Sequence, residues 1–161
     1  MGTGEAAGTE FATLPGRSWP SIRQFSVFLE NRVGQLLDVV RRFEGSKVRI
    51  VALSIVDSVD YAIVRMVLSH PEQGRELLER AGLAIAESDL IAVELPGGSQ
   101  PLLQICSALL QGEINIHYAY PLITHPHGRS AIALHVDSLE LATQTLHQKG
   151  FTLLTEADLQ Q

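Results

Sequence analysis

The chain has 161 residues, of which 45% are hydrophobic and 19% are charged. These values are typical of a folded protein with one ordinary domain or two very small ones, and they exclude an intrinsically disordered chain. The formal net charge of −6 disfavours nucleic acid as a partner, because affinity for a phosphate backbone depends on clustered Lys and Arg.

Membrane insertion and secretion are not expected. Charged residues or histidines interrupt every long apolar run, and residues 1–20 lack the basic start and apolar stretch of a secretory signal. We therefore expect a cytoplasmic protein without a membrane partner. A single cysteine, Cys106, excludes an intrachain disulfide. Its place in an apolar row with Ile105 and Leu109 predicts a buried side chain.

The first half of the chain predicts the order strand, helix, strand, strand, helix, strand after a tail at residues 1–22. Apolar residues alternate from Phe25 to Leu29, which is the strand period, and they follow helical spacing after Gln35. The expected elements are a strand starting near Arg23, a helix from Gln35 to about Glu44, strands at Val48–Val56 and Tyr61–Leu68, a helix that begins at Pro71 and ends at Gly82, and a short strand at Leu83–Ala86.

The same order recurs in the second half. Matching residues lie 66 positions apart from the first helix into the second strand and 68 positions apart after the hairpin, as in Leu36 and Leu102, Ile50 and Ile116, Val64 and Ile132, and Gly82 and Gly150. A repeat in fixed order with small loop insertions implies two copies of one supersecondary unit. We place the modules at residues 23–90 and 91–161.

Each unit should form an α+β, ferredoxin-like βαββαβ module, because every strand shows one apolar face and every helix one apolar stripe. Units of this size are marginally stable alone. We expect the two modules to lie side by side and form a continuous antiparallel sheet with the helices on one face. Aromatic residues such as Phe28 and Tyr118 add apolar area to the uncovered face, which predicts a homodimer.

Three stretches carry a resemblance to a known family. Residues 25–37 (FSVFLENRVGQLL) run from the first strand into the helix, residues 61–65 (YAIVR) form the hairpin strand, and residues 112–120 (GEINIHYAY) belong to the second copy. Over about residues 23–159 the chain resembles a stand-alone tandem ACT domain protein, and its motifs are similar to those of acetolactate synthase regulatory subunits. The resemblance implies a non-catalytic regulatory protein that binds a small molecule, expected to be an amino acid, between modules. It also implies a partner enzyme of amino acid metabolism and no cofactor.

The turn from the first strand into the helix has chemistry that suits an amino acid. Gly34 lets the backbone approach a ligand closely, and free N–H groups at the helix start favour a carboxylate. The side chain of Asn31 can accept from an ammonium group and donate to a carboxylate.

The two copies carry different halves of the family motif. The resemblance implies that a partner module adds an Asn and an aliphatic residue from the start of its second strand, which Asn115 and Ile116 provide here. The first copy has Arg49 at that strand position, and the second has Gln100 where the loop glycine would be. We therefore expect one composite ligand site per chain, formed by Asn31, Arg32, Val33, Gly34, Gln35, Leu36, Asn115 and Ile116.

Other functions have weaker signals. The two histidines of residues 124–128 occupy a Pro- and Gly-marked turn without a carboxylate or thiolate at ligand spacing, so we expect no metal site. No catalytic motif is present, which favours a binding protein. The alternative is a small enzyme on a ferredoxin-like scaffold that uses His117 or His135 as acid or base. A third hypothesis, single-stranded RNA binding through Tyr118 and Tyr120, is weakened by the acidic charge balance.

Arg65 is a charged residue on an otherwise apolar strand. We expect it to pair with Asp57 or Asp60 across the hairpin rather than to contact a ligand carboxylate.

Overall fold

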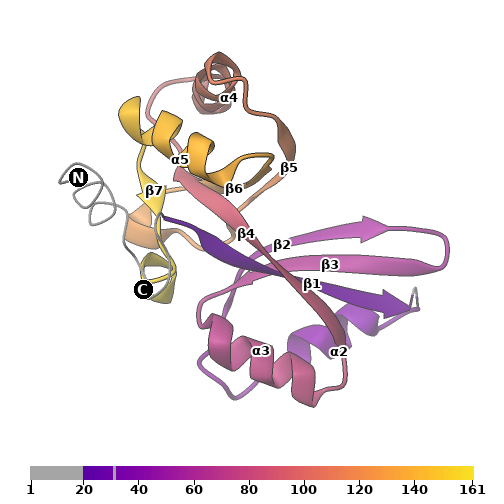
Figure 1. The fold of residues 1–161 in the computed structure, drawn as a ribbon. Helices are drawn as coiled ribbons and strands as arrows, with labels where there is room; N and C mark the ends of the chain where they lie inside the picture. The colour runs from indigo at the N-terminus through magenta and orange to yellow at the C-terminus, as the bar shows by residue number, and fades with distance from the viewer. Residues whose placement is uncertain (1–19, 31) are drawn as a thin grey trace, which may run out of the picture.

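The computed structural model describes residues 20–30 and 32–161, so the expected tail up to residue 19 and Asn31 lie outside the described residues. The helices and strands follow the predicted order (Figure 1). They are β1 Ile22–Glu30, α2 Gln35–Arg41, β2 Ile50–Asp57, β3 Tyr61–Leu68, α3 Pro71–Arg80, β4 Ala84–Glu94, α4 Pro101–Gln111, β5 Ile116–Pro121, the 3-10 turn η1 Pro126–Gly128, β6 Ala131–Val136, α5 Leu139–Gln148, β7 Leu153–Leu154 and η2 Asp158–Gln160.

Two boundaries differ from the expectation in an informative way. Helix α2 ends at Arg41, because the next residues form tighter turns in which the N–H of Glu44 bonds to the carbonyl of Arg41. Strand β4 continues to Glu94, well beyond the short strand expected at Leu83–Ala86. The last strand of the first module and the first strand of the second are therefore one continuous strand.

The described strands form one seven-stranded sheet with the order β2-β3-β1-β4-β6-β5, and β7 also pairs with β4. All of these pairs are antiparallel. Along β4, residues from Ala84 to Leu90 pair with β1, and residues from Ile91 to Glu94 pair with β6. The expected continuous antiparallel sheet is confirmed, and the strand's partner changes where we placed the module boundary.

One face of the sheet carries all four described α-helices. In the first module, Val39 of α2 and Leu78 of α3 are buried against strand residues such as Phe25 and Met66. In the second module, α4 and α5 form a similar core with β4 and β6, in which Ile105, Leu109 and Leu146 are buried. Figure 1 shows the two helix pairs at opposite ends of the molecule, with the strands between them. The helices thus cover one face, as expected.

The opposite face of the sheet folds onto itself. Ala52 of β2 forms a bridge with Leu122, just after β5, and the N–H of Ile123 donates to the carbonyl of Val51 at 2.6 Å. Residues of both modules are buried together in this third core, namely Ile22, Val51, Ala52, Val67 and Leu90 of the first and Ala92, Tyr120, Leu122, Ala131, Ala133, Leu154 and Leu159 of the second. The chain itself therefore covers much of the face that we expected a second copy to cover, and the homodimer stays a prediction.

A buried polar group lies at the centre of this contact between modules. Gln24 of β1 is 1% exposed and accepts a hydrogen bond from the Tyr120 hydroxyl at 2.6 Å. Its amide donates to the Tyr118 hydroxyl at 2.8 Å and to Ser88 Oγ at 2.9 Å. Because a buried amide is costly unless its hydrogen bonds are made, this arrangement favours one relative position of the two modules. The burial of Tyr120 also removes it from the surface that RNA stacking would need.

A stack of rings extends this contact towards solvent. The guanidinium of Arg65 lies 4.0 Å from the centre of the Tyr118 ring, which stacks on His135 at 4.7 Å. The His135 ring is 5.3 Å from that of His117. Arg65 thus faces the second module in a cation–π contact. The strand register places it opposite Ser54 and places Asp57 opposite Ala62, so its pairing with Asp57 or Asp60 stays a prediction.

The expectation of a buried Cys106 is also wrong. Cys106 is exposed, because the buried stripe of α4 consists of Ile105, Ala108 and Leu109. The helix turns Cys106 away from the core.

Replacing Gln24 by Leu should lower the free energy of unfolding by about 1–3 kcal/mol, because two tyrosine hydroxyls lose a partner at a largely buried position. Urea unfolding measures the change. A matched double variant, Gln24→Leu with Tyr120→Phe, should lose less than the sum of the two single variants, by about 0.5–3 kcal/mol. Strict additivity would contradict the network.

Acidification should destabilise the protein through His135. Burial, together with the positive charges of His117 and Arg65, lowers the pKa of His135 from its ordinary value of 6.5. The unfolded chain takes up this proton more readily, so the free energy of unfolding should begin to fall as the pH drops through 6.5, and the loss should be complete below the lowered pKa. Urea unfolding at several pH values, with the wild type and His135→Gln, measures this effect.

The variant should show a smaller loss over the same pH range. His70, whose pKa is also lowered by burial and by Lys47 and Arg49, is present in both proteins, so only their difference reports on His135. Identical pH dependences would contradict the assignment.

Candidate functional site

A cavity of about 280 Å³ lies in the first module where β1 ends and α2 begins. Its walls come from β1, α2, β2 and β3. Three of the residues predicted from the sequence, Arg32, Gln35 and Leu36, are among its lining residues, together with Leu29, Glu30, Ile55, Asp57, Ala62 and Val64. The predicted loop therefore borders a cavity of the size that suits a small molecule.

Gly34 lies in the turn between two lining residues of this cavity, Arg32 and Gln35, and is not itself a lining residue. It precedes α2 with a φ of 87°, in the left-handed region that glycine adopts without strain. An added Cβ would have no atom within 4 Å. A larger residue would therefore strain the backbone without a steric clash, so the glycine is explained by the turn itself.

Charges of both signs surround the cavity. Arg32 Nε lies 3.0 Å from Glu30 Oε2, and both side chains are mostly exposed. In the favoured orientation of the Gln35 amide, its oxygen faces the guanidinium of Arg32 and lies 3.1 Å from Arg32 Nε. Asp57, at the end of β2, adds a carboxylate to the opposite wall. Exposed ion pairs are weak, so a ligand can replace the Arg32–Glu30 contact at little cost.

The other predicted residues lie elsewhere. Val33 is fully exposed and does not line the cavity. The N–H of Asn115 donates to Asp137 Oδ1 at 3.2 Å, and Ile116 packs against the core of the second module. Neither residue lines the first-module cavity.

The two halves of the predicted composite site are therefore not joined within one chain. The end of β1 and the start of β5 lie in different parts of the molecule in Figure 1. The strands β2 and β5 lie at the two ends of the strand order, and the bridge between Ala52 and Leu122 closes the sheet over the third core.

Arg49, which replaces the strand Asn in the first copy, has a structural role. Its Nη2 donates to the carbonyl oxygens of Gln161 at 2.7 Å and Leu159 at 3.3 Å. These bonds hold the C-terminal residues of the second module against the first. Gln100, which replaces the loop glycine in the second copy, precedes the first turn of α4.

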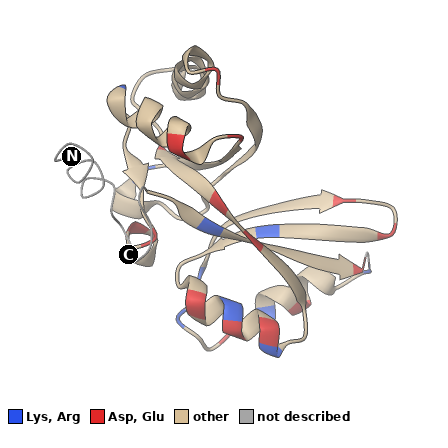
Figure 2. Ribbon diagram, in the orientation of Figure 1, with Lys and Arg blue, Asp and Glu red and all other residues tan. Residues whose placement is uncertain are grey.

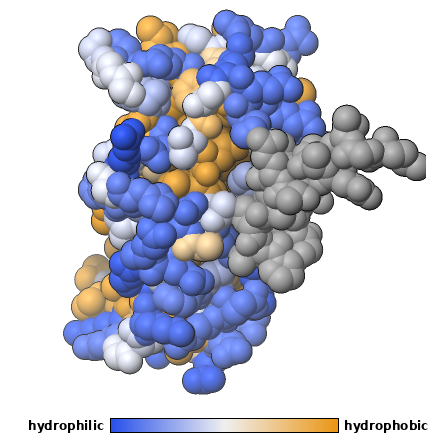
Figure 3. All heavy atoms as spheres, turned by 90° about the vertical axis from the view of Figure 1, so that its left-hand side faces the viewer, coloured by the Kyte–Doolittle hydropathy of each residue, from blue (hydrophilic) through white to orange (hydrophobic). Residues whose placement is uncertain are grey.

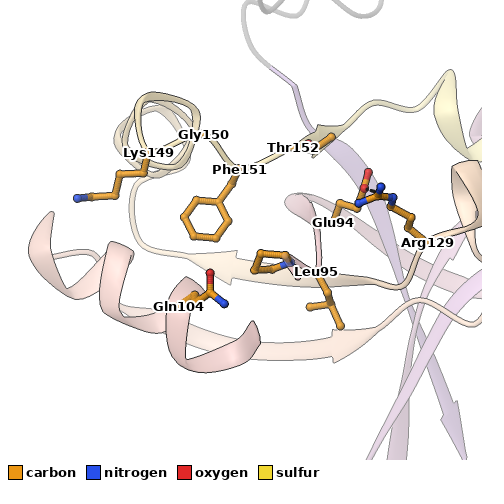
Figure 4. A pocket seen from close by; sticks show the side chains of 9 residues that line it. Glu94, Leu95, Gln104, Arg129, Lys149, Gly150, Phe151 and Thr152 are labelled. Atoms are coloured by element: carbon orange, nitrogen blue, oxygen red, sulfur yellow. Dashed lines mark ion pairs between the residues drawn. The ribbon is translucent and has the colours of Figure 1, made fainter. Parts of the chain in front are cut away.

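A second cavity, of about 250 Å³, was missed in the sequence analysis (Figure 4). It lies in the second module, beyond the end of β4. The lining residues are Glu94, Leu95, Pro96, Gln104, Arg129, Lys149, Gly150, Phe151 and Thr152. None of them belongs to the loop motif, so motif matching could not find this cavity. Comparison of the two copies position by position provides the signal.

Other side chains of the described residues bear on metal, nucleic-acid and membrane binding. In this part of the chain, no group of three or more His, Cys, Asp or Glu side chains is placed to hold a metal ion. His127 of the turn at residues 124–128 pairs with Asp158 at 2.9 Å, and this contact connects η1 to η2.

Figure 2 shows acidic and basic residues interleaved along α3, where Arg75 pairs with Glu72 and Glu87. Among the described helices, none is long and apolar enough to cross a membrane.

Solved structures share this fold. The protein BT0572 of Bacteroides thetaiotaomicron has a TM-score of 0.79 and 23% identity, covering 88% of this chain and 96% of that one. The regulatory subunits of aspartate kinase from Thermus thermophilus, in a ligand-free form, and from Thermus flavus have TM-scores of 0.54 and 0.51. Each subunit is 12% identical to this chain. The matches cover 80% of this chain and 93% and 92% of the two subunits, respectively.

No curated protein sequence matches the chain. The family comparison is decisive because it spans nearly all of the described residues. The sequence matches the ACT domain pair over residues 20–161, including both modules and the shared strand. This membership supports a regulatory ligand-binding role, and the chain belongs to the ACT domain pair family.

Proposed function

We propose that this protein is a non-catalytic regulatory protein that binds an amino acid in the first-module cavity. The observation that carries the proposal is the position of Arg32, Gln35 and Leu36. The sequence predicted them as ligand-binding residues, and they border a cavity that also has carboxylates at Glu30 and Asp57.

An α-amino acid suits this arrangement because it is small and carries both charges. Its ammonium group can pair with Asp57 or Glu30, and its carboxylate can pair with Arg32. Leu29, Leu36 and Val64 provide an apolar wall for a side chain. The cavity of about 280 Å³ is below the usual range for drug-sized ligands, as expected for a single amino acid.

Regulation requires that the ligand bind two states of the protein with different affinity. We infer a partner enzyme of amino acid metabolism in the cytoplasm. The similarity in fold to two aspartate kinase regulatory subunits fits this role. In a homodimer, a second copy could supply Asn115 and Ile116 and so complete the composite site that one chain does not form.

Isothermal titration with the common amino acids tests the proposal. At least one should bind the wild type, and Asp57→Asn should weaken it about tenfold or more, because a charge-assisted hydrogen bond to the ammonium group is lost. Asp60→Asn is the matched control, since it removes a neighbouring carboxylate that does not line the cavity. Its affinity should equal that of the wild type.

Asn115→Ala separates the two forms of the site. Unchanged affinity places the ligand within the first-module cavity, and a loss that depends on protein concentration indicates a site completed by a second copy. If no amino acid binds at millimolar concentration, the proposed function is wrong.

A further inference from the structure

We propose that the second module has its own binding site for an apolar α-amino acid, in the cavity of Figure 4, with Glu94 receiving the ammonium group and Arg129 the carboxylate. The ligand class rests on the proposed function, whereas the second cavity shares no lining residue with the first-module cavity. The loop motif predicts a single site per chain. The second cavity contains no residue of that motif, so it would be an additional site.

Backbone hydrogen bonds hold the walls of this cavity in place. The N–H of Glu94, the last residue of β4, donates to the carbonyl of Thr152 at 2.9 Å, and the N–H of Leu95 donates to that of Ser130 at 2.9 Å. Gln104 of α4 donates to the carbonyl of Gly97 at 2.9 Å and so fixes the loop between β4 and α4. The cavity is therefore formed before a ligand arrives, which reduces the entropic cost of binding.

The charged groups of the cavity differ in their exposure. Glu94 Oε1 lies 3.2 Å from Arg129 Nε, and the side chains are 12% and 67% exposed, respectively. A mostly buried carboxylate is stabilised by a cationic partner, while the exposed guanidinium of Arg129 can turn towards solvent. A zwitterion can insert between them, because its ammonium replaces Arg129 at Glu94 and its carboxylate gives Arg129 a new partner. Every charge then remains paired.

Three of the other lining residues, Leu95, Pro96 and Phe151, form the apolar part of the cavity wall. Leu95 and Phe151 pack partly against the second module's core and border the cavity beside Pro96. In Figure 4 the ring of Phe151 points into the space between α4 and the Glu94–Arg129 pair. Figure 3, which faces the left-hand side of Figure 1, shows hydrophobic residues within a hollow in the upper part of that face. In the second cavity, an apolar side chain of the ligand can contact Leu95, Pro96 and Phe151.

Lys149 has another role. Its ammonium donates to Gln111 and points away from the other labelled side chains in Figure 4. We therefore assign the ligand carboxylate to Arg129.

The first module provides an internal comparison. By the repeat offsets, Glu94 corresponds to Phe28 and Arg129 to Tyr61, which are 43% and 48% exposed. The glycine turn that precedes the last strand has the same form in both copies, with φ of 76° at Gly82 and 85° at Gly150. The fold thus accepts aromatic residues at both positions, so the Glu94–Arg129 pair is not needed for folding. A ligand that requires both charges explains the pair.

Titration followed by amide nuclear magnetic resonance tests this site separately from the first. The probes are L-leucine, with valine, isoleucine, methionine and phenylalanine in parallel. Leucinamide lacks the carboxylate of leucine, and 4-methylpentanoate lacks its ammonium group. Signals of Gly150 and Thr152 report on the second cavity, and signals of Ala62 and Val64 report on the first. At least one of the five amino acids should shift the second-cavity signals.

The variants should separate the two charges of that ligand. Glu94→Gln should weaken leucine and leucinamide at the second cavity about tenfold or more and affect 4-methylpentanoate less. Arg129→Gln should weaken leucine and 4-methylpentanoate and affect leucinamide less. Glu87→Gln is the matched control, because Glu87 also lies on β4 and pairs with an arginine, Arg75. This variant should leave ligand binding at both cavities unchanged.

Three results would overturn the inference. If the first-cavity signals shift and the second-cavity signals do not, the second site is wrong and the proposed function stands. If Glu94→Gln and Arg129→Gln both bind as the wild type does, the charge assignment and the site are wrong. If no probe shifts any signal at millimolar concentration, the second site is wrong. If no common amino acid binds in the calorimetric titration either, the proposed function also fails. The exposed position of Arg129 makes its variant safe to fold even where Glu94→Gln is not.

Discussion

Strand β4 is shared by the two modules, and the rest of the structure depends on this constraint. Its first part is hydrogen-bonded to β1 and its last part to β6 and β7, so neither module can rotate relative to the other without breaking main-chain hydrogen bonds. One end of the strand lies beside β1, where Ala84 pairs with Phe28, and its other end carries Glu94, which lines the second cavity. A change in the position of β4 therefore affects strand pairing in both modules.

The third core reinforces this constraint. It buries apolar residues of both modules against one another, and the buried Gln24 bonds to two tyrosines of the second module. The same packing separates the start of β5 from the loop after β1, which is why one chain does not assemble the composite site. Both cavities lie near strand ends, and none of their lining residues belongs to this core.

Much of the fold could be predicted from the sequence. The alternation around Phe25 and the helical stripe after Gln35 are local patterns, and the repeat offsets made the second module as clear as the first. The length of β4 and the closure at Ala52 and Leu122 are tertiary features that no local pattern contains. Cys106 shows the same limit, because an apolar row on a helix does not tell which of its residues face the core.

The candidate sites show where motif matching stops. Arg32, Gln35 and Leu36 could be predicted because they belong to a recognised loop, whereas Glu94 and Arg129 come together through strand pairing of distant segments. Native-state amide hydrogen exchange tests the central claim, that the shared strand makes both modules one cooperative unit. The slowest amides of β1, β4 and β6 should open with the same free energy, equal to that of global unfolding. Exchange of β6 at a clearly lower free energy, while β1 and β3 remain protected, would contradict it.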